Sequence, residues 1–108
     1  MIYTYKDNSK EVSDNIKAAL LRGLETCGLV AEGYAKKLAP VDTGNLRNSI
    51  THDVDDGETA AYIGTNVEYA PYQELGTIHM KAQPFLKPAV ADHANEYRKI
   101  IENELKNG

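Results

Sequence analysis

The feature that most constrains this chain is an apolar stripe that recurs at steps of three and four residues. Such spacing predicts a single amphipathic helix from Ser9 to Leu38. Ser9 can supply the N-cap oxygen, and Pro40 ends the helix because it excludes Ala39 from helical geometry. The stripe consists of Val12, Ile16, Leu20, Leu24, Cys27, Ala31, Tyr34 and Leu38. At about 1.5 Å per residue, this helix would span roughly 40 Å, which is longer than a domain of this size is wide.

Three glycines interrupt the predicted helix, at Gly23, Gly28 and Gly33. Each costs about 1 kcal/mol relative to alanine in a helix interior. Each also leaves backbone uncovered, so that another element can approach closely at that point. The alternative is a helix that breaks or bends near one of the three glycines.

A strand is predicted within Leu46 to Val54, and a hairpin turn follows it. Asp56-Gly57 suits a two-residue type I′ turn, which needs a positive φ at both central positions. Counting outward from this turn places Val54 opposite Thr59, His52 opposite Ala61 and Ile50 opposite Ile63. The apolar members then share one face, so we expect Ile50 and Ile63 to be cross-strand neighbours in the core.

The segment after the hairpin predicts a short helix and one more strand. Pro71 near a first helical position and Gly76 at a C′ position indicate one or two helical turns between Glu68 and Gly76. Weak alternation of apolar residues from Thr77 to Gln83 predicts a third strand.

A second amphipathic helix is predicted beyond Pro84. Pro88 opens it and a Glu102–Lys106 pair supports it. Its apolar positions are Val90, Ala94, Tyr97, Ile101 and Leu105. The element order predicts an α+β fold in which a long N-terminal helix and a C-terminal helix pack on a small antiparallel sheet containing the hairpin. With 108 residues the chain has room for one core, so we expect a single domain over residues 1–108.

Composition excludes several classes of protein. With 42% hydrophobic and 26% charged residues, the chain is expected to fold rather than to remain disordered. The net charge of -4 argues against an autonomous nucleic-acid-binding protein. The basic pairs Lys36-Lys37 and Arg98-Lys99 fit solvated helix faces. The sequence lacks an apolar run long enough to cross a bilayer, and its N-terminus is too polar for a signal peptide, so we expect it to be made and used in a cytoplasm.

No pattern of catalytic or metal-binding residues emerges from the sequence. The three histidines, His52, His79 and His93, lack the spacing of a zinc site. Cys27 continues the apolar helical stripe and is expected to be a buried, unreactive thiol. Ser9, Ser13 and Ser49 lie outside any G-x-S-x-G elbow. We therefore expect no enzymatic activity, no cofactor and no metal.

Acidic residues gather across the predicted hairpin turn, at Asp53, Asp55, Asp56 and Glu58. They lack the twelve-residue loop and terminal bidentate glutamate of a calcium site. A solvated turn is therefore expected, in which Asp55 faces Glu58.

Tyrosine is unusually frequent, with seven tyrosines against one phenylalanine and no tryptophan. Tyr62, Tyr69 and Tyr72 lie close together after the hairpin. The apolar body and polar tip of tyrosine suit protein interfaces, and a position at the edge of the core explains these residues equally well.

Four sequence blocks occur in a characteristic order: APVDTGNLRNSI at 39–50, IGTNVEYA at 63–70, ELGT at 74–77 and QPFLKPA at 83–89. Together they resemble the small tail-component family of long-tailed bacteriophages and prophages. Members of that family are placed among the head–tail joining, tail-completion or neck proteins. The resemblance implies a small α+β subunit of a ring at the neck or tail of a virion, and it implies no catalysis.

Two of these blocks have a structural explanation. Asp42-Thr43-Gly44 can form a turn in which the Asp42 or Thr43 side chain caps a backbone N–H and Gly44 takes a conformation that other residues resist. Phe85, between two prolines, presents a large apolar ring that can anchor the last helix on the core.

The resemblance also implies partners, namely copies of the chain itself and the neighbouring connector or tail proteins. Assembly would take place in the cytoplasm of a bacterial host, without a membrane, and genome DNA would pass through such a ring without sequence-specific contact. Our candidates for one interface are Tyr69, Tyr72 and Glu74, and the exposed side of the first helix is the candidate for the other. The alternatives are a small enzyme and a generic protein- or nucleic-acid-interaction domain without catalysis.

Overall fold

The computed structural model describes residues 2–6, 14–39, 45–79 and 81–107 of the chain. These residues form three strands and five helices. The elements are β1 (Ile2–Lys6), α1 (Asp14–Leu38), α2 (Asn45–Ser49), β2 (Thr51–Asp55), β3 (Ala60–Gly64), α3 (Ala70–Leu75), α4 (Leu86–Ala91) and α5 (Ala94–Asn107).

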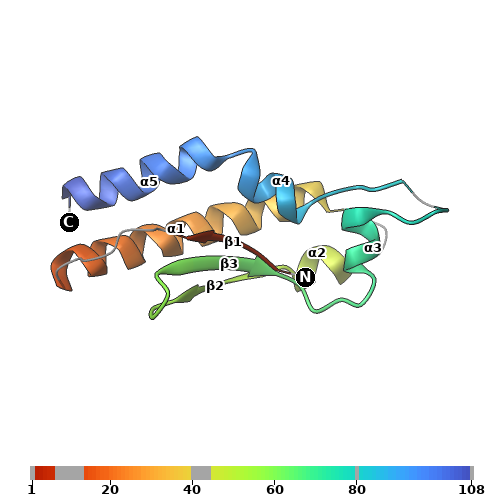
Figure 1. The fold of residues 1–108 in the computed structure, drawn as a ribbon, viewed down its shortest axis with the longest axis horizontal. Helices are drawn as coiled ribbons and strands as arrows, with labels where there is room; N and C mark the ends of the chain where they lie inside the picture. The colour runs from red at the N-terminus through yellow and green to blue at the C-terminus, as the bar shows by residue number, and fades with distance from the viewer. Residues whose placement is uncertain (1, 7–13, 40–44, 80, 108) are drawn as a thin grey trace.

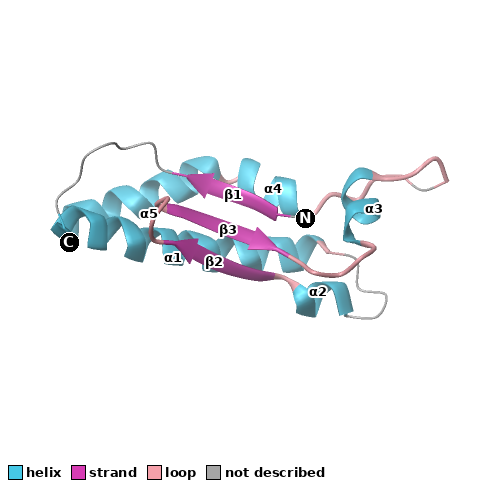
Figure 2. Cartoon of the chain, turned by 60° about the horizontal axis from the view of Figure 1, so that its bottom comes forward, coloured by secondary structure: helices cyan, strands magenta, loops and turns pink. Residues whose placement is uncertain are grey.

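The described elements are arranged in layers along an elongated body of 50 × 22 × 21 Å. The long helix α1 lies in the middle, with α5 on one side and the sheet on the other (Figure 1). Strands β2 and β3 pack against α1, and β1 packs against α4. No described helix covers the opposite face of the sheet, which is turned toward the viewer in Figure 2. The fold is α+β, with both helices and the hairpin that the sequence predicted.

The long helix runs unbroken through all three glycines. Its buried stripe includes Leu20, Leu24, Cys27, Ala31 and Ala35. The predicted members at its two ends, Ile16 and Leu38, remain exposed because the helix extends past the core. Ser9, Val12 and Pro40 lie outside the described residues.

Two glycines of α1 lie where another element approaches closely. A Cβ atom on Gly23 would lie 2.7 Å from Cδ1 of Ile101 in α5, and one on Gly28 would lie 2.8 Å from Cδ2 of His52 in β2. A Cβ atom on Gly33 would have no neighbour within 4 Å. The first two glycines therefore let α1 serve as the middle layer between α5 and the sheet.

The hairpin forms, but its predicted register is wrong by two residues. Asp55 pairs with Ala60 and Val54 with Ala61, so the loop has four residues, 56–59. Positive φ occurs at Thr59, with a value of 52°, and not at the two positions that a type I′ turn requires. The Asp55 side chain explains the longer loop, because its Oδ1 accepts hydrogen bonds from the N–H groups of Gly57 and Glu58. The predicted cross-strand pairing of Asp55 with Glu58 is therefore also wrong.

The predicted pairing of Ile50 with Ile63 is wrong as well, because β2 begins only at Thr51 and His52 lies opposite Ile63. The residues just before the strand form α2, and Ile50 follows the end of this helix directly. Both isoleucines are nevertheless buried in the core, as expected. For Ile63 this follows because a shift of two residues does not change the face of the strand to which a side chain points.

The third strand lies at the N-terminus and not at Thr77–Gln83. Strand β1 pairs antiparallel with β3, which gives the order β1-β3-β2 and makes β3 the central strand. The described residues of the segment that was predicted as a strand, 77–79 and 81–83, instead form a loop, in which the Thr77 hydroxyl accepts a hydrogen bond from the N–H of His79. This local side-chain bond favours a turn over an extended strand.

The predicted C-terminal helix is two helices, α4 and α5, separated at Asp92 and His93. Helix α4 begins at Leu86, so Pro88 lies in its first turn, as predicted. The short helix α3 forms as predicted, with Pro71 in its first turn and Gly76 after its last residue at a φ of 78°. No helix in the described ranges is long and apolar enough to cross a membrane.

Candidate assembly surface

Exposed apolar side chains gather on α3. Tyr69, Tyr72 and Leu75 recur every three residues, which places them along one side of the helix, and their exposed fractions are 39%, 58% and 68%. We call these three residues the α3 patch. Contiguous apolar side chains on a surface commonly mark a site of contact with another protein. The sequence identified the two tyrosines but not Leu75.

Glu74, the third candidate for this interface, lies inside the fold with an exposed fraction of 3%. Its carboxylate accepts hydrogen bonds from the N–H groups of Phe85, Leu86 and Lys87. These are the first N–H groups of α4, which have no partner within the helix itself. Glu74 thus fastens α4 to α3, and the surface candidates are reduced to Tyr69 and Tyr72.

Phe85 is fully buried in the core cluster, beside the carboxylate that holds its backbone. Its ring and its N–H are therefore fixed by separate contacts at the point where α4 begins. The predicted turn at Asp42, Thr43 and Gly44 lies outside the described residues.

The second candidate surface, the exposed side of α1, carries scattered apolar side chains. Ile16, Leu29 and Leu38 are all exposed, but they lie more than two helical turns apart in sequence. They do not form a compact patch comparable to the one on α3.

His52 belongs to an ionic bridge that the sequence did not reveal. Its Nε2 lies 2.6 Å from Glu25 Oε1 and its Nδ1 lies 2.9 Å from Glu32 Oε1. Two carboxylates of α1 therefore bind one ring on β2. Burial lowers the pKa of His52, but the hydrogen bonds with Glu32 and Glu25 outweigh it, and the net pKa is raised. Burial likewise opposes ionisation of Glu32, yet its bonds with His52 and Lys36 give a net lowering of its pKa. The bridge fixes the hairpin to the long helix.

The other two histidines have different surroundings. His93 stacks flat on the ring of Tyr34, with 3.6 Å between ring centroids, and so joins the start of α5 to α1. The Tyr34 hydroxyl donates a hydrogen bond to Glu96, and this bond raises the pKa of Tyr34. His79 is exposed in the loop after α3.

Cys27 is buried, as predicted, and it is not an activated nucleophile. Burial is the main cause that raises the pKa of the thiol to about 11, and the nearby charge of Glu96 adds to it. The Sγ atom lies 3.6 Å from the carbonyl oxygen of Tyr97, as a weak donor would. A nucleophilic cysteine needs the opposite shift.

The acidic residues of the hairpin are exposed and spread along it. Among the residues that the structure describes, no three side chains of the metal-binding types come together. The Tyr62 hydroxyl donates a hydrogen bond to Glu58. Lys17 from α1 reaches within 3.9 Å of Asp56.

The uncovered face of the sheet contains a hollow that the sequence did not predict. Ile2, Gly64 and Thr51 lie side by side across the three strands, and Gly64 contributes no side chain to the middle of this row. Tyr62 and Asp53 form the next row toward the hairpin turn. The hollow between these residues has a volume of about 550 Å³ and a largely apolar lining. We call it the sheet hollow.

Comparison with known proteins gives one informative match. Residues 5–76 match the model of a family described as "Bacteriophage HK97-gp10, putative tail-component". No curated protein and no solved structure matches the chain. The matched residues extend from Tyr5 in β1 to Gly76 after α3, and so include β2, β3, the α3 patch and the residues that line the sheet hollow except Ile2.

Proposed function

The chain belongs to the HK97-gp10-like family of bacteriophage tail components, and we propose that it is a ring-forming structural subunit at the head–tail junction or at the end of the tail. In this role it completes the tail or joins it to the head, and it performs no catalysis. Its partners are copies of itself and the connector or tail proteins on either side. Genome DNA passes through the ring without sequence-specific contact.

The α3 patch is the observation that carries this proposal beyond the family. A subunit that works alone gains nothing from three exposed apolar side chains on one short helix, since they cost solubility and stabilise no core. Tyrosines in such a position are frequent anchors of protein interfaces. Pro71 at the start of α3 and Gly76 at its end define the helix, so the patch is presented on a rigid element.

The remaining features favour a structural role over an enzymatic one. Cys27 is buried with a raised pKa, and His52 is held between two carboxylates, so neither is poised to react. The generic alternative, a nucleic-acid-binding domain, is disfavoured by the net charge of -4 and by the acidic hairpin.

The test places charge on the α3 patch in the phage that encodes the chain. We expect the double variant Tyr69→Glu/Tyr72→Glu to fold normally but to lower the titre of infectious particles by roughly tenfold or more, because buried interface tyrosines commonly contribute over 1 kcal/mol each. Electron micrographs should show heads and tails accumulating unjoined.

Leu105→Glu is the matched control, because it makes the same kind of change at an exposed apolar residue of α5 outside the patch. It should leave the titre unchanged. A normally folded double variant with full infectivity would remove the α3 patch from the joint.

A further inference from the structure

Beyond α3, the chain forms a loop that projects from the end of the molecule. Its described residues are 76–79 and 81–83, and we call it the projecting loop. Figure 1 shows it extending past α3 along the longest axis. Ile78 of this loop has an exposed fraction of 95%, the highest among the large hydrophobic residues that the structure describes.

The base of the projecting loop is closed by two sets of bonds. The N–H of Gln83 donates a hydrogen bond of 2.7 Å to the carbonyl of Gln73. The buried Glu74 carboxylate holds the backbone of the residues that follow, from Phe85 to Lys87. The fold thus fixes both ends of a loop that presents the side chain of Ile78 to solvent. Such an arrangement suits insertion into a partner.

The sheet hollow has a shape and polarity that suit an inserted apolar side chain. It is concave and largely apolar, with Ile2 and Thr51 on either side of the missing side chain at Gly64. Its volume of about 550 Å³ is ample for the aliphatic side chain of an inserted loop. The exposed Ile2 gains an apolar neighbour if the hollow is filled.

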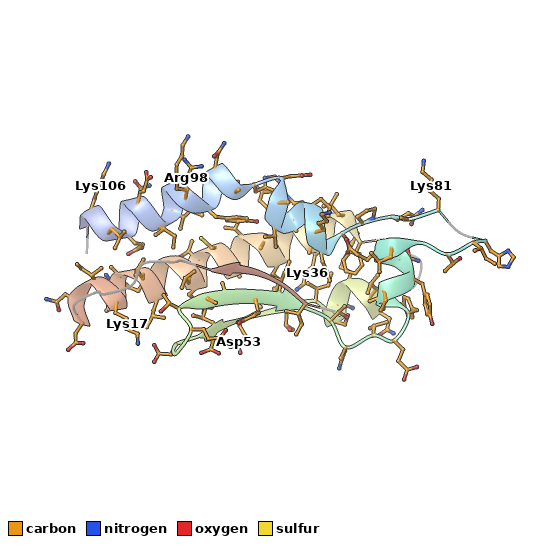
Figure 3. All side chains as sticks on the ribbon, in the orientation of Figure 1. Lys17, Lys36, Asp53, Lys81, Arg98 and Lys106 are labelled. Carbon is orange, nitrogen blue, oxygen red and sulfur yellow. The ribbon has the colours of Figure 1, made fainter. Side chains whose placement is uncertain are left out.

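The charges of the two surfaces are also complementary. Lys81 lies on the projecting loop, whereas Asp53 lies on the uncovered face of the sheet next to the hollow (Figure 3). Within the described residues, neither side chain has an ion-pair partner. The two residues project from opposite sides of the molecule in Figure 3, so they cannot meet in one chain. In a second copy, opposite charges at these places would orient the contact.

From these observations we propose that the projecting loop of one subunit inserts Ile78 into the sheet hollow of a second copy of this chain, with Lys81 paired to Asp53. The inference rests on the proposed ring. Two different surfaces that fit each other form a heterologous contact, which repeats from subunit to subunit and closes if the rotation between copies is right.

Cysteine cross-linking in virus particles and in the concentrated pure chain tests this contact. Each subunit with Ile78→Cys and Thr51→Cys carries one new thiol on each surface, so oxidation should give a ladder of dimers, trimers and larger multimers. Either single variant should give no multimer, because its new thiol has no counterpart and Cys27 is buried. A dimer from Ile78→Cys alone would show loop-to-loop contact and overturn the proposal.

Further variants test the shape and the charge of the contact. Gly64→Leu in the cross-linking background fills the sheet hollow from a strand position, and it should abolish the ladder while Gly33→Leu, on an open face of α1, leaves it intact. Lys81→Glu or Asp53→Lys should each lower the yield of multimers by roughly fivefold, and the two together should restore it. A double reversal that remains as defective as the single ones would overturn the pairing.

The outcomes separate this contact from the ring itself. Rings in electron micrographs without the ladder would overturn the loop-to-hollow contact and leave the proposed function standing. Cross-links from Thr51→Cys to a different virion protein, and none to Ile78→Cys, would assign the hollow to that protein. Absence of both rings and ladder, in particles and in the pure chain, would contradict both proposals.

Discussion

His52 and Glu74 are polar side chains that the fold uses to fasten one element to another. Each is held by groups distant in sequence: His52 by carboxylates 20 and 27 residues away, and Glu74 by backbone N–H groups 11 to 13 residues away. Sequence analysis placed His52 on the correct strand but could not identify its partners, because helical spacing gives no information on which face of α1 meets β2. It assigned Glu74 to the surface together with Tyr69 and Tyr72, whereas three N–H groups at the start of α4, distant in sequence, offset its burial.

The bridge at His52 predicts a dependence of stability on pH. Because the folded pKa of His52 is raised, its contribution is fully present below the unfolded value of 6.5 and is lost as the pH rises through the folded pKa. Because the folded pKa of Glu32 is lowered, its contribution is present above 4.5 and is lost as the pH falls through the folded pKa. The bridge should therefore stabilise the fold most between these two values.

Urea unfolding of the native chain and of His52→Gln over a pH series measures this contribution. The difference in unfolding free energy between the two should shrink as the pH rises above neutrality. Glu32→Gln should flatten the profile more than Glu25→Gln, since Glu32 is the more buried of the two carboxylates. A constant difference across the series would show that His52 does not titrate in the bridge.

At the scale of elements, α1, the hairpin and α3 could be predicted, whereas β1, α2 and the separation of α4 from α5 were missed and a strand was wrongly placed at Thr77–Gln83. Long apolar periodicity identified α1, and proline and glycine identified α3. The hairpin loop was misjudged because the Asp55 side chain stabilises a four-residue turn, a local bond that the Asp-Gly rule does not consider. Strand β1 was missed although its Ile, Tyr and Thr residues favour a strand, and its pairing with β3, distant in sequence, is a tertiary event.

The close contacts of α1 predict opposite effects for two identical substitutions. Gly33→Ala should stabilise the chain by about 1 kcal/mol, because the site is open and alanine favours the helix. Gly28→Ala should destabilise it by roughly 1 to 3 kcal/mol, because the new methyl group would displace the His52 ring from its carboxylates. Denaturant unfolding of the two variants measures the difference, and equal stabilisation by both would show that β2 does not pack closely at Gly28.

At the scale of the whole molecule, the described body is long and its two ends differ. The start of α1 and the end of α5 lie at one end, and α3 with the projecting loop lies at the other (Figure 1). The family resemblance was visible in the sequence, and the match over residues 5–76 confirms it. The sheet hollow could not be foreseen, since it depends on the register that brings Gly64 between Ile2 and Thr51.

The central claim is that this chain completes or joins the tail of a virus particle, and complementation tests it most directly. A phage or prophage mutant that lacks the chain should produce full heads and separate tails. Addition of the purified chain to that lysate should restore infectious particles, whereas the Tyr69→Glu/Tyr72→Glu variant should not. Joined, infectious particles from the mutant without the added chain would contradict the claim.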